Sequence, residues 1–142
     1  FDYQPTPDVR AILNFYTYTA EELIDYIGTP PSPATNFAEI DGRGFEIELD
    51  WKVAENFRLN SNFAYQRTEN KITDASVHDV PGMQFYLNPH WTFLPDWSLG
   101  GQFYWIADRL REKGDPRQDI DDYGLVNLIL SPHFSPARRM LA

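Results

Sequence analysis

The chain has 142 residues, no cysteine, and a formal charge of −9 from 12 basic and 21 acidic side chains. This length fits one ordinary domain, and zero cysteine excludes a disulfide framework, a thiolate zinc site and a cysteine nucleophile. The acidic balance argues against a nucleic-acid partner, because phosphate binding requires a basic surface. Aromatic residues nevertheless make up 15% of a chain whose mean hydropathy is −0.49, and this excess needs an explanation.

No apolar run approaches the length of a membrane-spanning helix, so the sequence excludes a helical membrane protein. A transmembrane β-barrel stays open, because alternating strands give it the mean hydropathy of a water-soluble protein.

Clusters of Pro, Gly, Asp and Asn divide the chain into runs of β-rich sequence. We predict six strands, over about 9–20, 43–53, 57–66, 83–93, 97–105 and 122–130, and expect Glu21–Ile24 to extend the first. The links at 54–56 and 95–96 are short, whereas those near 25–37, 68–81 and 111–121 are long and polar. Short turns at one end and long loops at the other are typical of an outer-membrane barrel.

The run 43–53 alternates strictly between apolar and polar residues. Its odd positions are Phe45, Ile47, Leu49, Trp51 and Val53, and its even positions are Gly44, Glu46, Glu48, Asp50 and Lys52. Period two predicts a strand with one apolar and one charged face, and the next three runs repeat the pattern. We expect Pro89 to cause a bulge, and Gly42, Gly44, Gly100 and Gly101 to ease curvature or bulges.

The length of the runs separates two kinds of β protein. About eleven residues at ~3.3 Å each, tilted about 40°, climb roughly 26 Å, which matches an outer-membrane apolar band of about 25 Å. Globular strands average only about 5–6 residues. A soluble antiparallel β-sandwich with an aromatic core is the alternative, and strand length and turn asymmetry count against it. In the barrel interpretation a lipid-facing aromatic belt comprises Phe45, Trp51, Phe57, Phe93, Trp97 and Trp105.

Several segments together resemble the barrel of TonB-dependent outer-membrane receptors. Residues 40–51, IDGRGFEIELDW, resemble the GxGxExE strand of that family, and a short turn with FRLNSNFAY at 57–65 follows. Residues 80–82, 95–100 and 104–105 look like the next strands, and 108–109 with 121–128 match the pattern before the final hairpin. The resemblance covers roughly residues 9–130, through the order and spacing of motifs that are individually weak.

The resemblance implies an all-β fold: an antiparallel up-and-down meander of about six long strands, a partial segment of a 22-stranded transmembrane β-barrel. We interpret 1–130 as partial receptor barrel and 131–142 as an atypical tail, truncated or disordered. Such receptors import scarce large nutrients across the outer membrane of Gram-negative bacteria. Their partners are outer-membrane lipid, their own plug domain, and the TonB complex through an N-terminal region. Plug, energy-coupling box and closing hairpin have no counterpart here, so we expect an internal fragment.

The resemblance also implies roles for two groups of charged residues. Glu46, Glu48, Asp50 and Arg58 would face the lumen and plug, and Glu46 or Glu48 could pair with a plug arginine. The outward loops carry candidate ligand contacts at Asp74, His78, Asp79, Arg111, Asp115 and Arg117. Solvated lumen charge and a charged rim are the alternatives for the two groups.

Enzymatic and metal sites have little support in the sequence. The three histidines lack a second ligand at metal-binding spacing, and no nucleophile elbow or phosphate loop occurs. We therefore expect no enzyme, no cofactor and no nucleic-acid partner. An iron–siderophore chelate is the favoured ligand, with cobalamin, haem and oligosaccharide open. A soluble binding module and a small porin-like or adhesin-like barrel are the alternative functions.

Overall fold

The computed structural model describes residues 1–26, 34–72, 74–77, 80–111 and 116–132, and these form one antiparallel sheet without a helix. Its strands are β1 (Asp2–Thr6), β2 (Val9–Tyr26), β3 (Ala34–Ala54), β4 (Phe57–Asn70), β5 (Ala75–Ser76), β6 (Pro81–Leu94), β7 (Trp97–Arg109) and β8 (Tyr123–Pro132). The order across the sheet is β1-β2-β3-β4-β6-β7-β8, and β5 pairs with β4. The predicted all-β antiparallel meander is confirmed.

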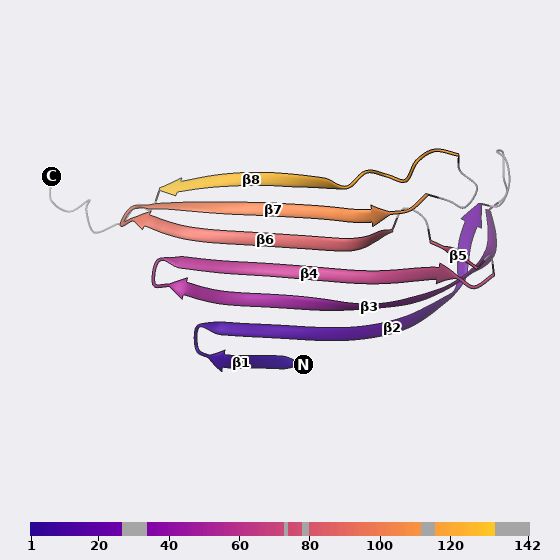
Figure 1. The fold of residues 1–142 in the computed structure, drawn as a ribbon, viewed down its shortest axis with the longest axis horizontal. Helices are drawn as coiled ribbons and strands as arrows, with labels where there is room; N and C mark the ends of the chain where they lie inside the picture. The colour runs from indigo at the N-terminus through magenta and orange to yellow at the C-terminus, as the bar shows by residue number, and fades with distance from the viewer. Residues whose placement is uncertain (27–33, 73, 78–79, 112–115, 133–142) are drawn as a thin grey trace.

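The two ends of the sheet differ in the length of their connections. Figure 1 shows the turns β1–β2, β3–β4 and β6–β7 at one end, each formed by the two residues between neighbouring strands. The connections β2–β3, β4–β6 and β7–β8 all lie at the other end and are longer. The predicted asymmetry between a short-turn end and a long-loop end is therefore present in the fold.

Regular pairing carries the sequence alternation across the sheet. From Ile40↔Asn70 to Lys52↔Arg58, β3 and β4 keep one register, and β2 pairs with β3 in one register from Val9↔Trp51 to Ala20↔Ile40. Because side chains alternate between faces, residues paired directly across the strands lie on the same face. One such row contains Leu13, Ile47, Phe63, Phe85 and Trp105.

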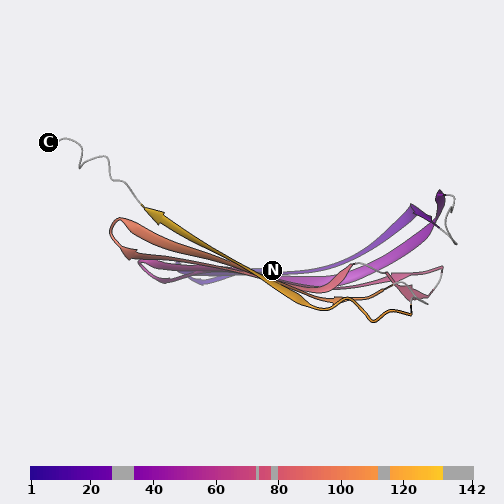
Figure 2. The ribbon, with the colours of Figure 1, turned by 90° about the horizontal axis from the view of Figure 1, so that it is seen from above.

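The sheet is a single layer with almost no buried core. Ala107, 3% exposed, is the one hydrophobic residue that is buried among the described residues. Phe15 is 76% exposed and Leu128 is 73% exposed. Figure 2 shows the strands as one thin, twisted layer with no second sheet on either side. A β-sandwich would cover this apolar face with a second sheet, so the sandwich alternative does not describe the chain.

Several details differ from the sequence prediction. β1 and β5 are additional short strands, and β2 and β3 are longer than expected because they continue into the long-loop end. The expected extension through Glu21–Ile24 is confirmed, with an irregular register between Ala20 and Leu23. The predicted bulge at Pro89 is wrong: β6 keeps its register through this residue, and the β6–β7 pairing only omits Asn88 and Pro89. Proline lacks the N–H of a ladder hydrogen bond, and the rigid neighbouring pairs hold the register.

No helix within the described ranges is long and apolar enough to cross a membrane. Residues 133–142 lie outside the described part of the chain, whereas Ser131 and Pro132 belong to β8. The atypical tail therefore stays a prediction.

Candidate functional site

The even positions of β3 build a polar face at the centre of the sheet. Glu46, Glu48 and Asp50 follow one another along this face, and each carboxylate lies opposite a small or amide residue of β4. Glu46 faces Ala64, and Glu48 faces Asn62. In the described structure neither glutamate forms a hydrogen bond or ion pair. The face therefore presents two carboxylates without a direct partner, and Arg10 of β2 lies within electrostatic reach of Glu48.

Asp50 is the one carboxylate of this group with a close partner, because the Asn60 side chain donates a hydrogen bond to its Oδ1. Arg10 lies opposite Asp50 across β2 and β3 but forms its ion pair with Asp2, at 2.6 Å between Nη2 and Oδ2. Asp50 therefore has an amide as its direct partner and Arg10 only at longer electrostatic range.

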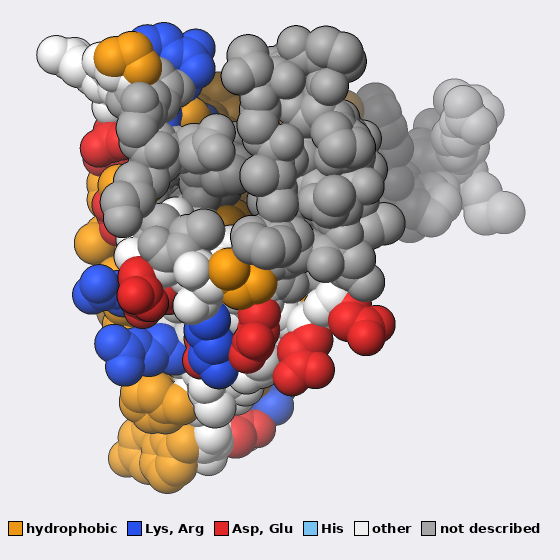
Figure 3. Space-filling model, turned by 90° about the vertical axis from the view of Figure 1, so that its right-hand side faces the viewer, with side chains coloured by type: hydrophobic (Ala, Val, Ile, Leu, Met, Phe, Trp, Pro, Cys, Tyr) orange, Lys and Arg blue, Asp and Glu red, His pale blue; other side chains and the backbone are white. Residues whose placement is uncertain are grey.

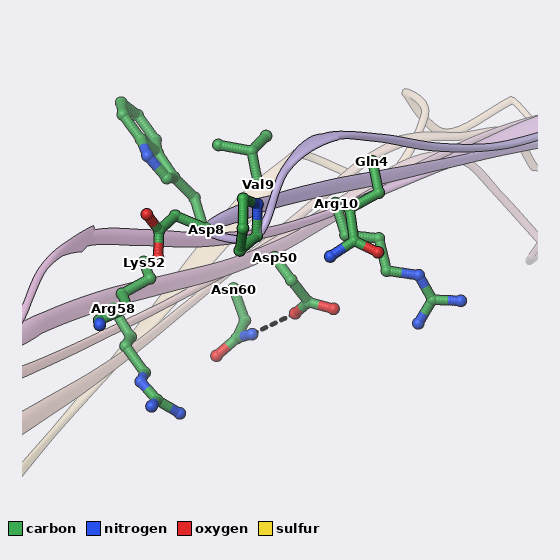
Figure 4. Close-up of a pocket in the computed structure, with 10 residues that line it drawn as sticks. Gln4, Asp8, Val9, Arg10, Asp50, Lys52, Arg58 and Asn60 are labelled. Carbon is green, nitrogen blue, oxygen red and sulfur yellow. Dashed lines mark hydrogen bonds between the residues drawn. The ribbon is translucent and has the colours of Figure 1, made fainter.

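The polar face becomes basic near the short-turn end. Arg58 pairs across the strands with Lys52 on one side and His90 on the other. The Lys52 ammonium contacts Glu55 of the β3–β4 turn at 2.6 Å, and this contact lowers the pKa of Glu55. A hollow of about 370 Å³ opens here, and Figure 4 shows Arg58, Asn60 and Asp50 among the side chains lining it. The structure thus brings two of the four predicted polar-face residues, Asp50 and Arg58, into the lining of this hollow, while Glu48 and Glu46 continue the row along β3.

Tyrosines on this face were missed by the sequence reasoning. Tyr16 and Tyr18 of β2 lie across Gly44 and Gly42, and a Cβ at either glycine would overlap the facing tyrosine ring. The glycines keep regular register, so they provide room for the rings instead of forming bulges. The sequence signal for this contact is a shared spacing. The first run has two tyrosines two residues apart, and the motif has two glycines with the same spacing.

A second tyrosine pair lies on the same face in the other half of the sheet. Tyr86 and Tyr104 have ring centroids 4.6 Å apart, and the Asn88 side-chain amide donates a hydrogen bond to the Tyr86 hydroxyl at 2.7 Å. Alternating aromatic and amide groups of this kind can bind a planar polar ligand by stacking and hydrogen bonding.

The opposite, apolar face carries all six residues of the predicted belt. Phe45 contacts Phe15, Phe63 and Tyr65 toward the long-loop end, with ring centroids 5.7 to 6.2 Å apart. Trp105 pairs with Phe85, nearer the middle. Phe57, Phe93, Trp51 and Trp97 border the short turns, where Trp91 joins them at 5.6 Å from Phe93. Phe15 and Trp91 were not part of the predicted belt, although both lie on the same alternating face.

The long loops hold the remaining predicted residues. His78, Asp79 and Asp115 lie outside the described residues, and Asp74 has a positive φ of 49°. Arg111 is bound within its own loop: its backbone N–H donates to Asp119 at 3.1 Å and its Nε donates to the Gln118 carbonyl at 2.7 Å. Arg117 also interacts within the described structure.

Arg109 organises the same loop, although it was not among the predicted ligand contacts. Its Nη2 donates to the Asp121 carbonyl at 2.6 Å, and its guanidinium lies 4.8 Å from the centroid of the Tyr123 ring. A cluster of three or more His, Asp or Glu side chains that could hold a metal ion does not occur within the described ranges.

A protein-family model described as "TonB dependent receptor-like, beta-barrel" matches residues 1–137. The chain belongs to the TonB-dependent receptor β-barrel family. No curated protein matches it. The two faces and two ends of the sheet are therefore those of a TonB-dependent receptor barrel segment.

Solved structures share this fold. The "Copper transporter OprC" is 19% identical, with a TM-score of 0.70 over 89% of this chain and 21% of that chain. The ferric-catecholate import receptor Fiu from K12 E. coli is 12% identical, with a TM-score of 0.70 over 95% of this chain and 20% of that chain. FpvAI in its pyocin S2 complex is 14% identical, with a TM-score of 0.62 over 87% and 19%. The chain thus spans about a fifth of the length of each of these proteins.

Proposed function

We propose that the chain forms part of the barrel wall of an outer-membrane receptor that imports a scarce nutrient with energy from the TonB complex. The observation that carries this proposal is the single-layered sheet, with one exposed apolar face and one polar face, in a chain of the TonB-dependent receptor family. In water an uncovered face of this kind would drive aggregation, whereas lipid tails cover it in a membrane.

The difference between the two ends of the sheet supports an orientation in the membrane. Outer-membrane barrels have short periplasmic turns and longer extracellular loops. The turns β1–β2, β3–β4 and β6–β7 then lie on the periplasmic side, and the long loops lie outside. The apolar face contacts lipid, and the polar face lines the lumen.

Glu46 and Glu48 are the proposed contacts to a plug domain within the lumen. Both carboxylates lack an ion pair within the described part of the chain, and both lie on the polar face at mid-strand. A guanidinium of the plug could bind either carboxylate with two parallel hydrogen bonds, which fixes orientation as well as position. Asp50 and Arg58 are the corresponding contacts nearer the periplasmic end.

An iron–siderophore chelate is the favoured ligand, met first by the loops that carry Asp74, His78, Asp79, Arg111, Asp115 and Arg117. Among the structures with the same fold, one is named a ferric-catecholate import receptor and another a copper transporter. A metal chelate is therefore the ligand class that we propose, and its identity depends on loops and plug beyond the sheet.

The test uses the complete receptor that contains this chain, expressed in a Gram-negative host without its own iron receptors. We expect accumulation of a radiolabelled iron–siderophore, lost when TonB is deleted, and weaker accumulation of copper. Accumulation of copper alone would overturn the iron assignment. A receptor that is soluble and monomeric without detergent would overturn the barrel proposal itself.

A second arm tests the plug contacts. The double variant Glu46→Gln with Glu48→Gln should admit large antibiotics that the wild-type barrel excludes, because the plug is held less firmly. The matched control is Glu55→Gln with Asp96→Asn, which removes two carboxylates from the short turns. Equal antibiotic sensitivity of both double variants would contradict the assignment of Glu46 and Glu48.

A further inference from the structure

The polar face of the sheet divides into a charged half and a neutral half. On β2 to β4 its mid-strand positions include Arg10, Glu46, Glu48, Asp50 and Arg58. The polar-face positions of β7 from 98 to 106 and of β8 from 123 to 131 carry no charge; they are Ser98, Gly100, Gln102, Tyr104, Ile106, Tyr123, Leu125, Asn127, Ile129 and Ser131. Charge returns on β7 only at Asp108 and Arg109, and Figure 3 shows acidic and basic side chains gathered at this long-loop end.

The largest exposed groups of this neutral half are apolar side chains. Leu125 is 54% exposed, Ile129 is 50% exposed and Tyr104 is 37% exposed. The amide between the two aliphatic residues already has a partner, because Asn127 donates a hydrogen bond to Oε1 of Gln102 at 3.5 Å. The neutral half therefore offers apolar contact area, with its amides paired to each other.

An apolar patch on this face needs a cover other than lipid. The interior of an outer-membrane barrel is normally polar, and an exposed apolar patch marks a contact with another surface. A further strand of the barrel would pair with the backbone edge of β8, but side chains stand perpendicular to the sheet and would still face the lumen. The cover must therefore come from within the lumen.

The patch lies level with a carboxylate that is proposed to contact the plug. Glu48 pairs with Asn62, and the same row continues through Tyr86 and Tyr104 to Leu125. Large outer-membrane transporters have a plugged lumen, and a plug that reaches Glu48 lies at the height of Leu125 further along the wall. A passing substrate is a poorer occupant, because a transported molecule must bind weakly enough to leave.

We propose that Tyr104, Leu125 and Ile129 form an apolar docking surface for the plug domain, which keeps the plug on β7 and β8 when its charged contacts to β3 are broken. This inference rests on the proposed function, in which the polar face lines the lumen. Contacts to solvent-exposed carboxylates are screened by salt, whereas apolar contacts are non-directional and do not depend on charge. The plug is therefore released from the wall in a fixed order, from β3 first.

The test uses photo-cross-linking of the complete receptor in outer-membrane vesicles. A benzophenone amino acid is introduced singly at position 62, beside Glu48, at position 125 or 129, or at position 128 on the lipid face of β8. Mass spectrometry identifies the segment to which each position is cross-linked. We expect positions 62, 125 and 129 to reach the plug, and position 128, the matched control, to give no plug product.

Salt then separates the two kinds of contact. Raising the salt from about 0.1 M to about 1 M shortens the Debye length from about 10 Å to about 3 Å. The plug yield from position 62 should fall about fivefold, the largest factor that one exposed ion pair contributes. The yields from positions 125 and 129 should stay within about twofold, because apolar contacts are not screened.

Two double variants test the apolar character of the surface. Leu125→Asn with Ile129→Asn should raise the sensitivity of the cells to vancomycin about tenfold, because the plug loses two apolar contacts. The matched control, Leu125→Ile with Ile129→Leu, keeps the apolar area and should keep wild-type sensitivity. Equal sensitivity of the two double variants would overturn the inference.

The remaining outcomes separate this inference from the proposed function. Equal losses of yield at positions 62 and 125 in high salt would overturn the docking surface, and cross-links from 125 to an added iron–siderophore in place of the plug would overturn the choice of occupant. If position 62 reaches the plug but 125 and 129 do not, only this inference fails. If none of the three reaches it in an inserted receptor, the plug placement in the proposed function fails as well.

Discussion

The apolar face and the polar face are built from alternating residues of the same strands, yet they differ in how specifically each side chain interacts with a partner. On the apolar face, Phe45, Phe63 and Tyr65 are all large and half-buried, and ring contacts of about the same length recur along it. On the polar face, Asp50 has one specific amide partner, whereas Glu46 and Glu48 have none within the described structure. The apolar face therefore depends on its overall hydrophobicity, whereas the polar face depends on particular side-chain pairs.

The largest difference between the two faces is expected when an arginine is introduced on each face of β4 in turn. Phe63 and Asn62 are neighbours in sequence and lie on opposite faces. An arginine facing lipid at mid-membrane costs about 2–4 kcal/mol. Phe63→Arg should lower the free energy of unfolding from lipid vesicles by this amount, measured by denaturant titration of the complete receptor. Asn62→Arg, the matched control, should change it by less than about 1 kcal/mol, since water solvates the charge. Equal losses in both variants would remove the distinction between the faces.

The glycine at position 42 should be a sensitive small residue of the polar face, and its obstacle is a side chain. A Cβ there would overlap the Tyr18 ring, so Gly42→Ala should destabilise the barrel by about 1–3 kcal/mol. Because the obstacle is a side chain, adding Tyr18→Ala should recover most of the loss in a double-mutant cycle. Gly100→Ala is the control, since its nearest atom would be 3.8 Å away. Additive effects of Gly42→Ala and Tyr18→Ala would contradict the close approach.

A smaller effect is expected at the amide that binds Asp50. Asn60→Ala removes the donor to this carboxylate and should cost about 1 kcal/mol, because an exposed hydrogen bond contributes modestly. Asn62→Ala changes the neighbouring polar-face residue of the same strand and should be nearly neutral. Unfolding titrations that give the same value for both variants would show that the Asn60–Asp50 contact contributes nothing.

The smallest effect concerns the long-loop end and depends on pH. Hydrogen bonding to Asp41, and then to Glu39, raises the pKa of Lys71 above its ordinary value of 10.5. The stabilisation is therefore complete below this ordinary value and is lost as the pH rises through the higher pKa of the folded state. The difference in unfolding free energy between wild type and Lys71→Gln should be constant from neutral pH to about pH 10 and should shrink above it. A difference that instead shrinks on moderate acidification would contradict this assignment.

Features that follow from the local residue pattern could be predicted from the sequence. Features that depend on the register between paired strands could not. The alternation from Phe45 to Val53 was sufficient for the two faces, because a side-chain period of two is a property of any strand. The tyrosine rings over Gly42 and Gly44 could not be predicted, since they depend on the register between β2 and β3. The opposed pair Arg43 and Arg67 depends in the same way on the register between β3 and β4. β1 and β5 escaped prediction because strands of five and two residues carry little periodic signal.

The proposed function requires that lipid covers the odd-numbered face of β3 and that water or plug covers the even-numbered face. Since this chain has no cysteine, single cysteines at positions 45 to 53 can be introduced without competing thiols in the segment. Each is labelled with an environment-sensitive fluorophore in the complete receptor, and quenching by a lipid-borne quencher is compared with quenching by aqueous iodide. We predict strict alternation, with lipid quenching at odd positions such as 47 and 49 and iodide quenching at even positions such as 46 and 48. Quenching without alternation, or with the two sets of positions exchanged, would contradict it.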